Sequence, residues 1–146
     1  MEQDDISDIV FGVVHSYRLA MRATLKASEL GLNSMHVRCL SFIERNQRCT
    51  ANDIVQFLAR DKAQVARLIK EMIDKEWLTK SANPEDRRSQ FLALTTDGIK
   101  LASLIRDTQL DIHNTMLENL STERVKAFKT VAGTMAANLR SYGKDI

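Results

Sequence analysis

The strongest constraint on the fold lies in residues 61–95, which carry one helix pattern and two strand patterns with no long connection between them. Asp61 is a suitable N-cap for the helix. Apolar residues follow at the three- and four-residue spacing of one helix face: Val65, Leu68, Ile69, Met72 and Ile73. The other face carries small, amide or basic side chains: Lys62, Ala63, Gln64, Ala66, Arg67 and Lys70. We therefore expect a helix that packs one face on a core and presents a basic face to solvent.

Two short strands are expected directly after this helix. Residues 77–81 are partly β-prone, and residues 91–95 return with two leucines on one face. The segment between them, residues 83–89, contains Pro84, whose fixed φ angle suits a turn. The pattern therefore predicts a β-hairpin.

This hairpin carries Arg87 and Arg88 at its tip. A helix with a basic face, followed at once by such a hairpin, is the outline of a winged helix that reads DNA. The helix fits the major groove, and the hairpin tip can reach the narrower minor groove. A short helix that starts at Thr50 precedes the break at residues 59–60, so the two helices form a helix-turn-helix. That pattern alone is a weak signal, and the appended hairpin strengthens it.

Amphipathic helices are expected on both sides of this segment. Their expected ranges are 5–29, 34–46, about 96–119, and from 121 onward. Gly31 ends the first helix, and Ser34 is the expected N-cap of the second. Thr95 or Thr96 caps the third helix.

The apolar stripes of the first and the last two helices are too extensive for one chain to cover, so we interpret them as a homodimer interface. A two-fold DNA reader needs two reading helices about 34–36 Å apart, which favours this interpretation. The alternative is a helical cap packed on the same chain.

The expected fold class is mainly α with a small β-hairpin wing (α+β), a winged helix-turn-helix flanked by dimerisation helices. Residues 1–33 are expected to form the N-terminal dimerisation helix, residues 34–95 the DNA-binding domain, and residues 96–146 the C-terminal dimerisation helices, in one intertwined domain. The charge distribution agrees with this division. Residues 34–94 contain 11 Lys and Arg against 8 Asp and Glu, whereas the flanks contain 10 against 11.

Several other function classes find no support in the sequence. The N-terminus is acidic and no apolar run approaches the length of a membrane span, so we expect a cytoplasmic protein without a membrane partner. Cys39 and Cys49 are too few and too unpatterned for a disulfide framework, which fits a reducing compartment. No nucleophile–base pair, phosphate loop or metal constellation occurs at useful spacing, so we expect no enzyme activity, cofactor or metal.

Residues 86–89 (DRRS) and 92–98 (LALTTDG) resemble the D-x-R … L-x-L-T-x-x-G signature of the MarR (multiple antibiotic resistance regulator) family of bacterial transcription factors. Residues 61–69 (DKAQVARLI) are similar to the family's recognition helix, and the order of elements matches over essentially the whole chain. The resemblance implies a homodimer on a pseudo-palindromic operator, usually a repressor, often released by a small-molecule effector or an oxidant. Glu76 stands where the family commonly has glycine, so we expect another arrangement to close the recognition helix.

The base-reading residues are expected on the exposed face of that helix. Gln64 and Arg67 lie three residues apart and project from one side. Gln can pair with adenine and Arg with guanine, each worth about 1–3 kcal/mol of discrimination. Ala63 and Ala66 would let the helix approach the bases closely. The alternative, two solvated side chains, is disfavoured by the apolar opposite face and the adjoining wing.

Other cations and helix ends are expected on the DNA backbone. Arg60, Lys62 and Lys70 suit phosphates, which position a protein without specifying a sequence. Ser34 and Thr50 stand at expected helix N-termini and could donate to phosphate in addition to capping.

The wing residues complete the expected DNA-binding set. The resemblance favours Arg87 in the minor groove, with Asp86 holding the wing by an ion pair. Arg88 is expected on a phosphate or a carboxylate, and Ser89 belongs to the same motif. Plain solvation of a charged turn is the alternative for both arginines.

Cys39 is an ambiguous residue because it lies three positions after His36, so that the two share one side of a helix. Such a pair could ligate zinc, or His36 could lower the thiol pKa and make an oxidant sensor. Two ligands do not make a metal site, and a buried cysteine is more often a small core hydrophobe, so core packing is favoured. Cys49, in a turn before Thr50, is expected to be more exposed and the more oxidisable of the two.

The resemblance also implies an effector cleft between the dimerisation helices and the winged helix. The candidate residues mix apolar bodies with polar tips: His15, Tyr17, Arg18, Met21, Met35 and Cys39. Met and Tyr at helical spacing are more often core than pocket. The alternative to the whole functional interpretation is a winged-helix protein-interaction module that does not read DNA, which an intact Gln64 and Arg67 face argues against.

Overall fold

The computed structural model describes residues 2–144. The elements are α1 (Glu2–Leu25), α2 (Ala27–Leu30), α3 (Ser34–Arg45), β1 (Cys49–Thr50), α4 (Ala51–Leu58), α5 (Lys62–Asp74), β2 (Leu78–Ala82), β3 (Gln90–Leu94), α6 (Thr96–Met116) and α7 (Thr122–Lys144). The chain divides into two compact units, residues 1–112 and residues 113–146, and each is considered by itself. The predicted fold class, mainly helical with a small β-hairpin wing, is confirmed.

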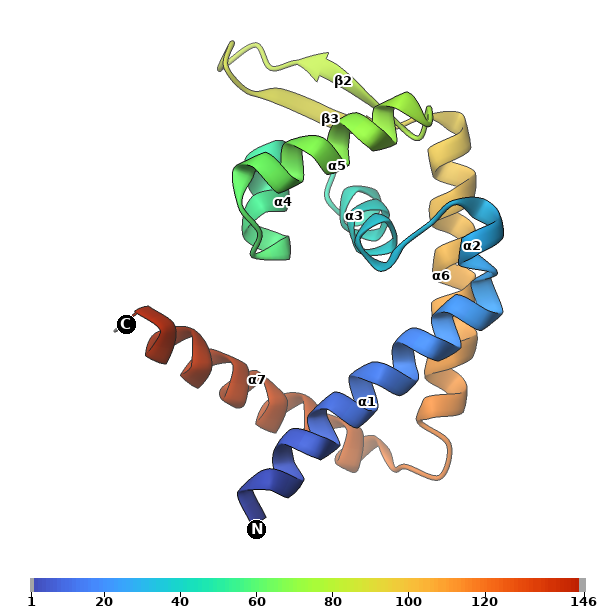
Figure 1. Ribbon diagram of the computed structural model, residues 1–146, viewed down its shortest axis with the longest axis vertical. Coiled ribbons are helices and arrows are strands. Elements are labelled where there is room, and N and C mark those ends of the chain that lie inside the picture. The colour runs from blue at the N-terminus through green and yellow to red at the C-terminus, as the bar shows by residue number, and fades with distance from the viewer. Residues whose placement is uncertain (1, 145–146) are drawn as a thin grey trace. The chain divides into compact units, whose positions relative to one another are not determined.

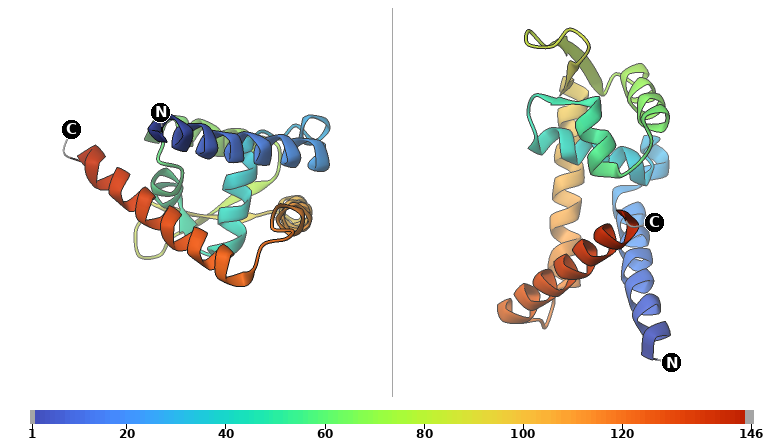
Figure 2. Two further views of the ribbon diagram at one scale, coloured as in Figure 1. Left: turned by 90° about the horizontal axis from the view of Figure 1, so that it is seen from below. Right: turned by 90° about the vertical axis from the view of Figure 1, so that its left-hand side faces the viewer.

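The first unit contains the winged helix. Helices α4 and α5 form the helix-turn-helix, and the β2–β3 hairpin follows α5 directly (Figure 1). The three strands form an antiparallel sheet in the order β1-β3-β2, with Leu78 opposite Leu94 and Ala82 opposite Gln90. The hairpin projects from the winged helix in both further views (Figure 2). Strand β1 was not predicted, because two residues are too short to show any periodicity.

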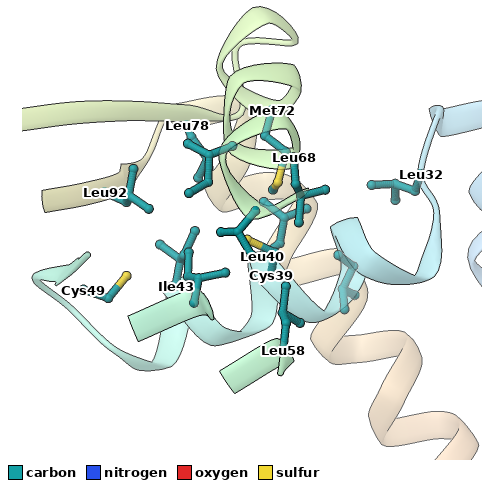
Figure 3. Packing of buried hydrophobic residues seen from close by; sticks show 14 of the residues in the cluster. Leu32, Cys39, Leu40, Ile43, Cys49, Leu58, Leu68, Met72, Leu78 and Leu92 are labelled. Atoms are coloured by element: carbon teal, nitrogen blue, oxygen red, sulfur yellow. The ribbon is translucent and has the colours of Figure 1, made fainter. Parts of the chain in front are cut away.

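The core of this unit is formed where the winged helix packs on α3. Leu40 of α3, Ile54 of α4 and Met72 of α5 are completely buried. Leu78 of β2 and Leu92 of β3 close the same cluster from the sheet (Figure 3). Burial of these apolar side chains from four helices and two strands, with Ile105 of α6 included, fixes α5 with one face inward.

Of the N-caps predicted for α3, α4 and α5, two are confirmed and one is wrong. The Asp53 amide donates to Thr50 Oγ1 at 3.3 Å, and the Gln64 amide donates to Asp61 Oδ1 at 2.8 Å. The N-cap of α3 is Asn33 rather than Ser34, because the His36 amide donates to Asn33 Oδ1 at 2.9 Å. Ser34 is instead the first helical residue.

The first helix ends earlier than its apolar pattern predicts. Lys26 takes a left-handed φ of 53°, which stops α1 at Leu25 and starts the four-residue α2. The expected single helix over residues 5–29 is therefore wrong. Gly31, with a φ of 72°, ends α2 as a terminating glycine should.

The end of α5 corrects the expectation for Glu76. Its amide donates to the Ile73 carbonyl at 2.9 Å, and the Trp77 amide donates to the Met72 carbonyl at 3.0 Å. These two bonds are a Schellman motif, the usual closure that glycine makes possible. Glu76 forms it with a left-handed φ of 64°, so no other arrangement closes the helix.

The start of α6 is locked to the base of the hairpin. The Thr95 amide donates to the Trp77 carbonyl at 3.0 Å, and Thr95 Oγ1 accepts from the Gly98 amide at 3.0 Å and donates to the Glu76 carbonyl. A Cβ on Gly98 would lie 2.1 Å from the Trp77 carbonyl oxygen. Glycine is therefore required here, because the helix and the loop touch backbone to backbone.

The second unit contains the end of α6 and helix α7. Ser121 precedes α7, and its Oγ accepts from the Arg124 amide at 3.2 Å, so the predicted start of this helix is confirmed. Many of the apolar side chains of α7 are exposed: Phe128, Val131, Met135, Leu139 and Tyr142. The division of the chain into dimerisation and DNA-binding segments stays a prediction.

Candidate nucleic-acid interface

The outward face of α5 presents the predicted base-reading and phosphate-binding side chains together. Val65 and Ile69 face the core, with 1% and 3% of their surfaces exposed. The opposite positions of α5 are all exposed: Lys62, Ala63, Gln64, Ala66, Arg67 and Lys70. Arg60, in the turn before the helix, is exposed as well. The helix therefore offers small, amide and cationic groups to a partner, which is the composition that base edges and phosphates require.

A surface hollow of about 330 Å³ lies along this helix. Gln64 and Arg67 line it together with Arg60, Met35, Leu68 and Glu71. Glu71 was not among the predicted site residues. Its carboxylate, about half exposed, stands one turn beyond Arg67 and places a negative charge at the C-terminal end of the reading face.

The tip of the wing is built by side-chain to backbone hydrogen bonds. Asn83 Oδ1 accepts from the Glu85 amide, and Asp86 Oδ1 accepts from the Arg88 amide, each at 3.0 Å. Across residues 2–144 Asp86 takes part in no ion pair, so the predicted ion pair that would hold the wing is wrong. Asp86 acts instead as a turn-forming acceptor, a role for which its short carboxylate is suited.

This turn leaves the two arginines free to meet a partner. Arg87 and Arg88 are exposed, and Ser89 is half-buried with its amide donating to the Asp86 carbonyl at 3.2 Å. The turn is thereby preorganised while its guanidinium groups remain in solvent. An arginine in this position is suited to a narrow, electronegative minor groove.

Arg48, which was not among the predicted site residues, is a further cation at the base of the wing. Arg48 precedes β1 with a left-handed φ of 62°, and its guanidinium lies 5.3 Å from the centroid of the Phe91 ring on β3. Thr50, predicted as a phosphate donor, pairs with Phe91 across the sheet. Arg48 is thus brought beside the N-terminus of α4 by strand pairing.

Both cysteine thiols are buried and shielded from solvent. Cys39 is fully buried and Cys49 is 3% exposed, so Cys49 is the more exposed of the two as expected, but it is still buried and lies in β1 opposite Leu92 rather than in a turn. Burial raises the pKa of Cys39 to about 12 and also raises the pKa of Cys49. The predicted core role of Cys39 is confirmed. In the described part of the chain no three His, Cys, Asp or Glu residues are grouped to hold a metal ion.

The predicted effector-cleft residues have different environments. Met21 and Cys39 lie in the hydrophobic core. Tyr17 and Met35 are half-buried against it, and burial raises the pKa of the Tyr17 hydroxyl. His15 and Arg18 are exposed on α1, and Met35 also lines the hollow along α5. No helix within residues 2–144 is long and apolar enough to cross a membrane.

Two sequence matches relate this chain to known proteins. Residues 30–89 match the model of the MarR family. The chain is 25% identical over 107 residues to the HTH-type transcriptional regulator BilQ of Clostridioides difficile (strain CD3), a match that covers 73% of this chain and 71% of that protein. The predicted resemblance is therefore confirmed.

Solved structures show the same fold. S. aureus MepR in its DNA-binding conformation matches with a TM-score of 0.82 at 22% identity, covering 92% of this chain and 98% of that chain. A mutant MarR from E. coli complexed with operator DNA matches with a TM-score of 0.78 at 19% identity, covering 92% of this chain and 95% of that chain. At these identities the likeness establishes the winged-helix fold.

Proposed function

We propose that this chain, whose residues 30–89 match the model of the MarR family, is a transcriptional regulator that binds double-stranded operator DNA as a cytoplasmic homodimer and represses transcription. The operator is a pseudo-palindrome, because a two-fold dimer presents two identical reading helices. Regulation of this kind needs no catalytic step.

The observation that carries the proposal is the pairing of the α5 face with the wing. Gln64 and Arg67 are exposed on the side of α5 opposite its buried residues, and Arg87 is exposed at the tip of a preorganised turn. The arrangement supports base reading in the major groove by the two α5 residues and a minor-groove or phosphate contact by Arg87.

Exposed apolar surface supports the homodimer. Helix α1 leaves Phe11 72% exposed, and α7 leaves Leu139 70% exposed. Further exposed apolar residues on α1 are Ile6, Ile9, Val10, Val13 and Val14. Surface of this kind on both helices favours cover by a second copy of the chain. The buried thiols favour a small-molecule effector over an oxidant as the signal that modulates DNA affinity.

The test is a selection of genomic fragments by the purified protein at two salt concentrations. We expect an enriched pseudo-palindrome whose affinity falls steeply with salt. Arg67→Ala should relax specificity at one base of each half-site at a loss of about 1–3 kcal/mol, whereas Arg87→Ala should weaken binding to all sequences more evenly. Arg22→Ala, which removes an exposed arginine of α1, is the matched control and should change neither property.

The competing function is a winged-helix module that binds protein. Absence of any enriched motif, with weak and sequence-independent binding only, would favour it and overturn the proposal. The search would then turn to protein partners of the same α5 face.

A further inference from the structure

A buried histidine closes the start of α3 in an unusual capping box. The Asn33 amide donates to His36 Nδ1 at 3.1 Å, and the His36 amide donates to Asn33 Oδ1 at 2.9 Å. In most capping boxes a Glu or Gln side chain accepts the first of these bonds. Here a ring with 2% of its surface exposed performs this role, so the box depends on the protonation state of an imidazole.

The other ring nitrogen faces the recognition helix. Because Nδ1 accepts a hydrogen bond, the neutral ring carries its proton on Nε2. His36 Nε2 lies 3.2 Å from Glu71 Oε1 of α5. Nε2 is buried and has no aligned hydrogen bond among the described residues, so this contact is electrostatic rather than a well-directed bond. Glu71 is its nearest polar partner and also lines the hollow beside Gln64 and Arg67.

Lys75 makes a second connection between the same two parts of the fold. Its Nζ donates to the Gly31 carbonyl at 2.9 Å and lies 4.0 Å from Glu71 Oε1. Trp77 completes the cluster: its ring lies 4.9 Å from Lys75 Nζ and packs edge-on against His36 at 5.4 Å between centroids. The last turn of α5 is thus attached to the α2–α3 junction through His36 and Lys75.

We propose that His36 is a positioning residue for the recognition helix. Its neutral ring connects the α2–α3 junction to Glu71 of α5. Protonation of Nδ1 breaks the hydrogen bond from the Asn33 amide, which detaches the junction from the ring and weakens operator binding. The inference rests on the proposed function, because operator binding is the property that the position of α5 controls. It adds a residue that does not touch DNA to the set that determines affinity.

The chemistry follows from the donor and acceptor count of imidazole. A doubly protonated ring has two donors and no acceptor, so the Asn33 amide loses its partner and faces an N–H group instead. The new positive charge would strengthen the attraction to Glu71, which draws the ring toward α5 while the junction opens. Protonation therefore shifts the ring between two partners.

The groups that face His36 determine the pH range in which its ring is protonated. Burial is the largest influence and lowers the pKa of His36 below its ordinary value, Glu71 raises it, and Lys75 lowers it. Glu71 belongs to α5, and Lys75 is the C-cap residue of the same helix. The junction contributes the neutral Asn33, and the loop after α5 contributes the Trp77 ring. The capping box is consequently intact at neutral pH and opens on acidification.

The first experiment needs no DNA. The protection factor of the Asn33 amide against hydrogen exchange is measured from pH 7.5 to pH 5.0 in the whole chain, its His36→Gln variant, and a matched His113→Gln control that changes a half-buried histidine in the last turn of α6. Gln retains the capping-box acceptor but does not titrate. We expect protection to fall about threefold to tenfold with pH in the wild type and the control, and to stay constant in His36→Gln. Equal loss in His36→Gln would overturn the proposal.

The second experiment measures affinity for the fragment selected in the genomic experiment, at constant salt and over the same pH range. We expect the wild type and His113→Gln to lose about threefold to tenfold in affinity on acidification, and His36→Gln to lose less. Glu71→Gln, a change at a half-exposed side chain, guards against misfolding of the buried variant. Removing this carboxylate should move the midpoint to lower pH, and an unchanged midpoint would overturn the proposal.

Together, the two experiments distinguish failure of the proposed function from failure of the positioning role of His36. Loss of Asn33 protection with no sequence-specific fragment bound at any pH would refute the proposed function and leave the capping-box chemistry standing. Sequence-specific binding whose pH profile is identical in wild type and His36→Gln would refute the positioning role alone.

Discussion

The left-handed Glu76 is predicted to be a site where one substitution stabilises the protein. Glu76→Gly should raise the free energy of unfolding, because Glu76 holds a φ of 64° at the end of α5. A side chain with a Cβ in this conformation costs about 1–2 kcal/mol. Glycine removes that cost but loses about 0.5–1 kcal/mol through the greater freedom of its unfolded chain. The expected net gain therefore lies between about 0 and about 1.5 kcal/mol, with a centre of ~0.75 kcal/mol.

The assay is denaturant unfolding at one fixed protein concentration, because stability that includes subunit association depends on concentration. Two control variants isolate the cause. Glu76→Ala removes the carboxylate but keeps the Cβ, so it should gain much less than Glu76→Gly. Asp74→Gly, in the right-handed last turn of α5, should lose about 0.5–1 kcal/mol.

Two results would refute this reasoning. If Glu76→Ala stabilised as much as Glu76→Gly, removal of a negative charge at a helix C-terminus would explain the gain, and backbone strain would not. If Glu76→Gly were less stable than the wild type with an unchanged m value, the Schellman motif would not be strained by its glutamate.

Three further predictions concern the backbone, the thiols and the buried histidine. Gly98→Ala should lower the free energy of unfolding by about 2 kcal/mol or more, because its Cβ would meet the Trp77 carbonyl oxygen at 2.1 Å; denaturant unfolding measures this, and a loss below about 0.5 kcal/mol would contradict it. Cys39 and Cys49 should react with a thiol reagent far more slowly in the native protein than in denaturant, since burial raises both pKa values; equal rates would contradict the burial. The free energy of unfolding should fall as the pH drops below about 6.5, because the lowered pKa of His36 means that the unfolded chain takes up this proton first, and His36→Gln should reduce that slope.

The winged helix could be predicted because its signals are local. Thr50 and Asp61 are caps that bond within three residues, so the sequence alone contains both partners. The apolar face of α5 repeats at helical spacing, and the wing contains Asn83, Pro84 and Asp86, which suit a turn. Each of these features requires only neighbouring residues to be read.

The N-cap of α3 is a feature that the sequence does contain, although Ser34 was predicted in place of Asn33. Asn33 and Ser34 are both good N-cap residues. With Asn33 as the cap, the third helical position is His36, whose Nδ1 accepts the return bond. With Ser34 as the cap, that position would be Val37, which has no acceptor. The residue three positions after each candidate cap therefore distinguishes Asn33 from Ser34 as the N-cap.

Other features depend on contacts that no local pattern contains. Lys26, Arg48 and Glu76 adopt left-handed backbone conformations without being glycine, and tertiary packing imposes this geometry on residues that do not prefer it. The contact of His36 with Glu71 joins α3 to α5 across long sequence separation. For the same reason the sequence suggested Cys39 as the partner of His36, whereas the fold supplied a carboxylate.

Thr95, the single residue between β3 and α6, joins the wing directly to α6. Leu94 ends the strand and Thr96 begins the helix, and Thr95 is bonded to both Glu76 and Trp77. Helix α6 spans 21 residues, which is ~32 Å at 1.5 Å per residue. Because Thr95 is hydrogen-bonded to the loop that follows α5, a tilt of the first turns of α6 would have to bend the helix or turn the end of α5 and the hairpin together with it.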